Sequence, residues 1–210
     1  MPDSLTLLTF LGASMALTIA PGPDNLMVLA HSLARGRRAG LAFALGCALG
    51  CMTHMVWAAI GLSAALLASP VAFNGLKWLG AAYLVWMAVG AWRTRTGPAI
   101  ANGQPRRPRR HDLMRGFLAN AINPKVALFF LAFMPQFIEP SAGPVARQML
   151  VLGGIFMAQT IAIFGSIAWL AGHIGQWMQR HPRIAPWLDR LAGLVFIALA
   201  ARLAASAMSP

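Results

Sequence analysis

Six long apolar stretches dominate this 210-residue chain, and they follow one another with little polar sequence between them. Since a membrane-spanning helix takes roughly 20 apolar residues, six spans would use about 120 residues and leave room only for short loops. Charged residues make up 10% of the chain, well below the proportion in ordinary soluble domains. The sequence therefore predicts an all-α integral membrane protein with six transmembrane helices. The stretches lie at about 4–34, 41–67, 75–92, 116–138, 149–171 and 188–207.

Proline and glycine interrupt the first and the fourth of these stretches. The first is interrupted at residues 20–25 (Ala-Pro-Gly-Pro-Asp-Asn) and the fourth at residues 123–125 (Asn-Pro-Lys). Proline lacks a backbone donor and cannot continue a regular helix, and glycine permits unusual dihedral angles. We therefore expect helices 1 and 4 to be broken at mid-membrane, where protein or a water-filled cavity must satisfy the opened backbone.

The two halves of the chain show a weak internal repeat. An offset of 101 residues brings Pro23 onto Pro124 and Asp24 onto Lys125, and an arginine-rich segment lies between the halves. Three spans in each half give the halves opposite orientations, which is the inverted-repeat plan of many secondary transporters. The sequence thus predicts a single membrane transport domain over residues 1–210. It would consist of repeat one at about 1–92, a basic cytoplasmic linker at about 93–115, and repeat two at about 116–210.

Basic residues are concentrated in loops that six spans would place on one side of the membrane. The net charge is +12, but because the basic residues lie between apolar stretches, membrane orientation explains them better than nucleic-acid binding. Thirteen basic residues fall on this side and three on the other. Since basic loops stay in the cytoplasm, we expect both termini to be periplasmic. The thirteen are Arg35, Arg37, Arg38, Arg93, Arg95, Arg106, Arg107, Arg109, Arg110, Arg115, Arg180, Arg183 and Arg190.

Asp24 and Lys125 are charged residues at matching depth in the two interrupted stretches. Asp24 is 11 residues from Arg35, and Lys125 is 10 residues from Arg115. At about 1.5 Å per residue, both lie roughly 15 Å from the basic side, near the middle of a core about 30 Å thick. An unpaired charge there costs at least ~2.5 kcal/mol on insertion scales. The two side chains are therefore expected to pair or to share a polar cavity, with Asp24 the only acid inside a span. The alternative is that Asp24 or Asn25 merely caps the following half-helix.

The predicted breaks also offer binding groups for a small zwitterion. The half-helix after each break presents free N–H groups that suit a carboxylate. Asp24 would bind an ammonium group and Lys125 a carboxylate, so an amino acid has the right shape. His54 and Gln159 are expected either to be polar residues of the same cavity or to form hydrogen bonds between helices. The candidate substrate-binding or proton-coupling residues are Pro21, Gly22, Pro23, Asp24, Asn25, His54, Asn123, Pro124, Lys125 and Gln159.

Cys47, Cys51 and His54 lie on one face of the predicted second helix. They could form a soft-metal site for copper or zinc, which would make metal efflux an alternative function. Because no acid or second histidine lies nearby, packing is the preferred interpretation, and we predict no metal site and no cofactor. The two cysteines provide no disulfide framework.

The sequence does not favour an enzyme. It has no paired carboxylates for acid–base catalysis and no glycine-rich phosphate loop or Walker lysine. A non-transporting membrane scaffold is the other alternative, but it would leave two broken helices with opposite charges at one depth unexplained. The transported compound, the proton stoichiometry and the oligomeric state, including a homo-oligomer, stay open.

Two segments about 100 residues apart resemble the signatures of a known family. The segment 20–25 (Ala-Pro-Gly-Pro-Asp-Asn), followed by Gly36, Gly40, Gly46 and Gly50, is similar to the N-terminal signature of the LysE/RhtB amino-acid exporters. The segments 123–130 (Asn-Pro-Lys-Val-Ala-Leu-Phe-Phe) and 135–137 (Pro-Gln-Phe) resemble that family's second signature. The four glycines are also spaced for close helix packing.

This resemblance covers nearly the whole chain and implies a specific function. It implies a multi-pass protein of the bacterial plasma (inner) membrane that exports amino acids or their derivatives, driven by proton antiport. The implied partners are an amino-acid substrate, protons and membrane lipid, without nucleic acid. The chain departs from the family where Ala200 and Ala201 precede Arg202, because the family often has a glycine there.

Overall fold

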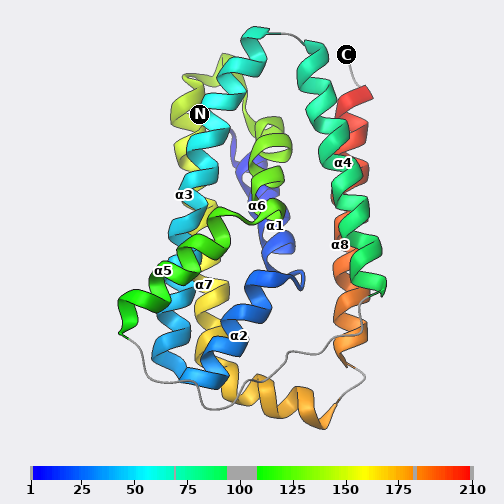
Figure 1. Ribbon diagram of the computed structural model, residues 1–210. Coiled ribbons are helices and arrows are strands. Elements are labelled where there is room, and N and C mark those ends of the chain that lie inside the picture. The colour runs from blue at the N-terminus through cyan, green and yellow to red at the C-terminus, as the bar shows by residue number, and fades with distance from the viewer. Residues whose placement is uncertain (1, 69, 94–107, 182–183, 209–210) are drawn as a thin grey trace.

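The computed structural model describes residues 2–68, 70–93, 108–181 and 184–208, and these residues form helices and connecting segments (Figure 1). This agrees with the predicted all-α class. Between α6 and α7 the chain forms the π-helix η1 (Phe129–Phe133) and the 3₁₀ helices η2 (Met134–Phe137) and η3 (Pro140–Ala142). The α-helices are α1 (Ser4–Ile19), α2 (Pro23–Arg35), α3 (Arg37–Ala68), α4 (Pro70–Arg93), α5 (Arg109–Ala121), α6 (Pro124–Leu128), α7 (Val145–Arg180) and α8 (Ile184–Met208).

The chain runs back and forth along the long axis of the molecule (Figure 1). In this view it descends through α1 and α2, rises through α3 and descends through α4. It then rises through α5 and α6, descends through α7 and rises through α8, so corresponding helices of the two halves run in opposite directions. The basic ends of α2, α4 and α7 and the starts of α3, α5 and α8 lie toward the lower end of the view.

The two interrupted stretches are bent helix pairs, as predicted. α1 and α2 meet at an angle of 57°, and α5 and the segment Pro124–Phe137 meet at 51°. Pro23 is the first residue of α2, and Pro124 is the first residue of α6. Proline is favourable at this position because its missing N–H would have no partner there and its φ suits a helix. A proline therefore begins the second half-helix of each bent pair.

Glycine permits a close crossing between α3 and α5. A Cβ atom at Gly46 would lie 2.0 Å from the carbonyl oxygen of Leu113, and one at Gly116 would lie 2.1 Å from that of Phe43. Neither site has room for a side chain, so the two backbones approach as in small-residue helix contacts of membrane proteins. The predicted packing role is thus confirmed for Gly46. Gly36 has a different role, since its φ of 87° lets the chain turn between α2 and α3.

The described residues contain three helices long and apolar enough to cross a membrane, or five spans when each bent pair counts as one. The expected third span, 75–92, lies in α4, which is not among these five, so six spans stay a prediction. Most of the expected linker, residues 94–107, lies outside the described residues. Its last part differs from the expectation, because α5 already begins at Arg109.

Candidate functional site

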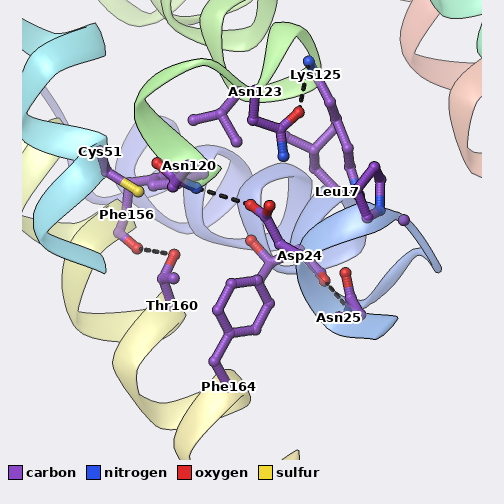
Figure 2. A pocket seen from close by; sticks show the side chains of 14 residues that line it. Leu17, Asp24, Asn25, Cys51, Asn120, Asn123, Lys125, Phe156, Thr160 and Phe164 are labelled. Atoms are coloured by element: carbon purple, nitrogen blue, oxygen red, sulfur yellow. Dashed lines mark hydrogen bonds between the residues drawn. The ribbon is translucent and has the colours of Figure 1, made fainter. Parts of the chain in front are cut away.

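A small cavity lies where the two broken helices meet (Figure 2). It encloses about 20 Å³, which is room for about one water molecule. An amino acid does not fit in this volume, so the structure shows the site in a closed form. The polar residues that line it are Thr18, Asp24, Asn25, Cys51, Asn120, Asn123, Lys125 and Thr160.

Asp24 lies in the first turn of α2 and is 5% exposed. Its Oδ2 atom accepts a hydrogen bond of 2.8 Å from Nδ2 of Asn120, which lies near the end of α5 (Figure 2). The other polar atom of this amide, Asn120 Oδ1, is buried and has no hydrogen-bond partner among the described residues. Buried acceptors are usually satisfied, so the carboxylate and this oxygen together can accept from a further donor in the cavity.

Lys125 lies in the first turn of α6 and is 4% exposed. Its Nζ atom donates a hydrogen bond of 2.9 Å to the carbonyl oxygen of Ala20 and lies 5.3 Å from the ring centroid of Phe196. Because α1 ends at Ile19, the Ala20 carbonyl belongs to the break of the first half. A cation from the second half therefore satisfies backbone that the first half leaves open.

The cavity brings Asp24 and Lys125 together, while their hydrogen bonds go to different partners. Of the two expected arrangements, the geometry corresponds to a shared polar cavity. Gly22 allows the lysine to approach, since a Cβ atom there would lie 3.2 Å from Lys125 Nζ. The carboxylate and the ammonium are thus available in one closed space.

The structure contradicts the alternative in which Asp24 or Asn25 caps α2. The N-cap of α2 is Gly22, and this end has no side-chain capping hydrogen bond. Asn25 instead donates through Nδ2 to the carbonyl oxygen of Thr18 at 2.7 Å, and so satisfies the last turn of α1. Asn123 does act as a cap, because its Oδ1 accepts from the backbone N–H of Lys125 at 3.0 Å.

Four candidate residues lie outside the cavity lining. Pro21 belongs to the first break, and Pro124 begins α6. The Nε2 atom of His54 lies 2.8 Å from the carbonyl oxygen of Asn120. Gln159 donates through Nε2 to Thr18 Oγ1 at 2.9 Å, so it supports a lining residue. Its Oε1 atom is buried without a partner among the described residues.

The two cysteines are buried and free. Cys51 donates through Sγ to the carbonyl oxygen of Cys47 at 3.4 Å, and only Cys51 lines the cavity. In the described part of the chain, no three His, Cys, Asp or Glu side chains are grouped so that they could hold a metal ion. No observation on these residues therefore favours metal efflux.

Sequence reasoning missed two features of this region. Asn120, the partner of Asp24, was not a candidate, although a polar residue one turn before a predicted break is itself a signal. Asp112 was expected in the linker but is 1% exposed in α5. Its carboxylate forms an ion pair with Arg35 of α2 and lies 3.6 Å from His31 Nε2. Asp24 is thus not the only acid in the bent pairs.

Two ties therefore hold α2 against α5. The bond from Asn120 to Asp24 joins them beside the cavity, and the ion pair between Arg35 and Asp112 joins their opposite ends. Each of these helices is one half of a broken pair. The two half-helices are therefore linked to each other at both ends.

Sequence comparisons relate this chain to known membrane proteins and efflux proteins. The chain is 33% identical to an uncharacterised membrane protein of Pseudomonas aeruginosa, with 91% of each chain covered. It is 30% identical to the homoserine/homoserine lactone efflux protein of Salmonella typhimurium, over 94% of this chain and 95% of the relative. It is 27% identical to the leucine efflux protein of Enterobacter sp. strain 638, over 93% of each chain.

No solved structure matches the chain. The sequence model of one family, described as LysE type translocator, matches residues 15–207. This match covers both helix breaks and every residue that lines the cavity. The chain therefore belongs to the LysE type translocator family.

Proposed function

We propose that this protein is a secondary transporter that exports amino acids or amino-acid derivatives across the bacterial inner membrane by proton antiport. The observation that carries the proposal is a buried carboxylate, Asp24, and a buried ammonium, Lys125, in one closed cavity. Membership of a translocator family supports transport. Relatives named as homoserine and leucine efflux proteins support an amino-acid substrate.

The substrate would exchange its own charges for the present contacts of the cavity. Its ammonium group would donate to Asp24 and to the free Oδ1 of Asn120. Its carboxylate would accept from Lys125, which would leave the Ala20 carbonyl. Charge-assisted hydrogen bonds of this kind are stronger than neutral ones, so an amino acid would be preferred to an uncharged solute of the same size.

Asp24 is the candidate proton carrier. In this scheme its carboxylate holds the ammonium of the outgoing substrate and takes up a proton from the periplasm after release. The proton neutralises a charge that would otherwise be costly in a low-dielectric site, and it leaves on the cytoplasmic side before the next substrate binds. Each cycle then exchanges substrate for proton at one group.

Six spans in two inverted repeats support alternating access in this proposal. The opposite helix directions of the two halves and the two proline-started half-helices are typical of transporters with central binding sites. Counting α4 as the sixth span puts the basic helix ends on the cytoplasmic side and both termini in the periplasm. The two repeats would form one domain.

Everted membrane vesicles test the proposal directly. Vesicles that contain the protein, made acidic inside, should accumulate labelled homoserine or leucine at least several-fold above vesicles without it. Dissipating the proton gradient should abolish this accumulation. Transport that is unaffected by the gradient would exclude proton antiport, and no protein-dependent transport across a panel of amino acids would exclude the function.

A further inference from the structure

A second, larger hollow lies on the basic side of the cavity, between α2 and α7. It encloses about 330 Å³ and is open to the outside. Ser32 and Leu33 of α2 line it, together with Ala168, Trp169 and Gly172 of α7. This volume is more than ten times that of the closed cavity, and it lies near the basic helix ends.

One face of α2 leads from the cavity to this hollow. Asp24 lines the cavity and Ser32 lines the hollow, and Val28 lies between them at successive spacings of four residues. Residues spaced by four share a face of an α-helix. Val28 is fully buried, so the face is closed at this point.

One face of α7 makes the same connection. Thr160 and Phe164 line the cavity, and Ala168 and Gly172 line the hollow. Phe164 and Ala168 belong to the same buried apolar cluster as Val28. The cavity and the hollow are therefore separated by apolar side chains from the same two helices that line both.

We infer that the α2–α7 seam, defined by Asp24, Val28 and Ser32 on α2 and by Thr160, Phe164, Ala168 and Gly172 on α7, is the route by which a zwitterionic amino acid enters the cavity from the basic side. Val28 and Phe164 form its closed gate. This inference rests on the proposed transport function. It adds a vestibule, a gate and a direction of opening to the central site.

The ends of α2 allow it to move as a rigid element. It begins after the broken segment at residues 20–22 and ends at Gly36, whose φ of 87° marks a turn. α7, in contrast, is a continuous helix of 36 residues. The seam therefore opens when α2 moves away from α7.

The mouth of the hollow has the chemistry to attract an amino acid. Arg37 lies over the ring of Trp169 at 3.9 Å and donates through Nε to the Trp169 carbonyl oxygen at 3.1 Å. The guanidinium charge of Arg37 attracts the carboxylate of an amino acid. The ring of Trp169 offers an apolar surface to the side chain of that amino acid. His173 and Gln176 complete a polar rim. A zwitterion therefore meets a cation first and the carboxylate of Asp24 after the gate opens.

A reversible tether across the seam tests the inference. Leu33 Cγ, which occupies the place of a cysteine sulfur, lies 3.6 Å from a Cβ atom built at Gly175 of α7. The double variant Leu33→Cys/Gly175→Cys should therefore form a disulfide under mild oxidation. In everted vesicles this tether should lower the uptake of labelled homoserine and leucine at least tenfold, and a reductant should restore it.

A matched tether elsewhere on α7 is the control. Met55 Cγ of α3 lies 3.1 Å from a Cβ atom built at Gly153, and neither residue lines the cavity or the hollow. The double variant Met55→Cys/Gly153→Cys should transport at the same rate whether its disulfide is formed or reduced. The native Cys47 and Cys51 can stay, since both are buried.

The possible outcomes distinguish a failure of the gate inference from a failure of the proposed transport function. Equal transport by the oxidised and reduced seam variant would overturn the entrance while leaving amino-acid export intact. If the seam variant does not fold, labelling of Val28→Cys by an impermeant thiol reagent replaces it. Labelling from the basic side should rise at least severalfold when homoserine or leucine is added, and an unchanged rate would also overturn the entrance. Absence of transport by the unmodified protein would instead reject the function itself.

Discussion

Asp24 is the residue on which the proposed transport should depend most directly. Asp24→Asn removes the charge but keeps the size, and the amide oxygen can still accept from Asn120. Because the substrate ammonium then has no carboxylate to bind, we expect the transport rate to fall at least tenfold while the protein inserts normally. Uptake in vesicles, divided by the amount of inserted protein, measures this effect.

A second acid provides the control for this substitution. Glu139 is exposed after η2, and its carboxylate accepts from Ser141. Glu139→Gln removes one negative charge outside the cavity and should leave transport within about twofold of wild type, as surface substitutions usually do. Wild-type transport by Asp24→Asn would make the carboxylate dispensable.

Gly22 gives a finer test of the lysine side of the cavity. In Gly22→Ala the new methyl group would lie 3.2 Å from Lys125 Nζ, so the ammonium must shift by a few tenths of an ångström. Small displacements of a binding group are costly, and we expect the KM for amino acids to rise by up to about tenfold with normal insertion. Gly12→Ala has nothing within 4 Å of its new Cβ and should not change KM.

The sequence indicated the charged residues of the site but not their partners. Asp24 and Lys125 stand out because charges are rare inside apolar stretches. Asn120 is 96 residues from Asp24, and Ala20 is 105 residues from Lys125. Backbone carbonyls and single amides carry no pattern that links them over such separations, so these contacts appear only when the helices are packed.

At the scale of helices, the ion pair between Arg35 and Asp112 should hold α2 against α5. Asp112→Asn leaves the buried guanidinium facing a neutral amide, and breaking a buried pair typically costs about 3–5 kcal/mol. We expect a clear decrease in the melting temperature of the detergent-purified protein. In the variant Arg35→Gln/Asp112→Asn part of the stability should return, because neither charge of the buried pair remains.

An acid elsewhere provides the comparison. Asp189 of α8 is partly exposed, so Asp189→Asn should change the melting temperature little. Additive effects of the two substitutions at Arg35 and Asp112 would show that this pair does not couple the half-helices.

The α3–α5 crossing should be the least tolerant helix contact. Gly46→Ala would place a methyl group 2.0 Å from the Leu113 carbonyl oxygen, and rigid backbone atoms cannot move aside. We expect much less folded protein in the membrane. Gly165→Ala on α7, where nothing lies within 4 Å, should accumulate normally, and equal amounts of both variants would contradict the close crossing.

The breaks of the helices were predictable, whereas the start of α5 was not. Proline and glycine act through the local backbone, so their positions mark the ends of helices directly. The first turns of α5 are rich in arginine, and their composition predicts a loop. They are helical in a tertiary setting that buries Asp112 against Arg35, 77 residues away, and such a partner overrides local composition.

For the molecule as a whole, the proposed orientation can be tested with exposed positions at its two ends. Ser141 lies between η2 and α7, and His181 follows α7. In intact cells, Ser141→Cys should react with impermeant thiol reagents. His181→Cys should react only after permeabilisation, because the basic side faces the cytoplasm. The reverse labelling pattern would show that the proposed membrane orientation is wrong. The seam would then open toward the periplasm.

The contact between Lys125 and Ala20 also has a consequence for biogenesis. The lysine is synthesised 105 residues after the carbonyl that it satisfies. At about 5–20 residues per second, the ribosome needs roughly 5–20 s to make the intervening chain. During this interval the carbonyl oxygen of Ala20 lacks its native hydrogen-bond donor. Water, lipid headgroups or the insertion machinery must therefore donate to it. If the ribosome stalls between the two halves, the fragment left in the membrane contains a backbone carbonyl without its native hydrogen-bond donor.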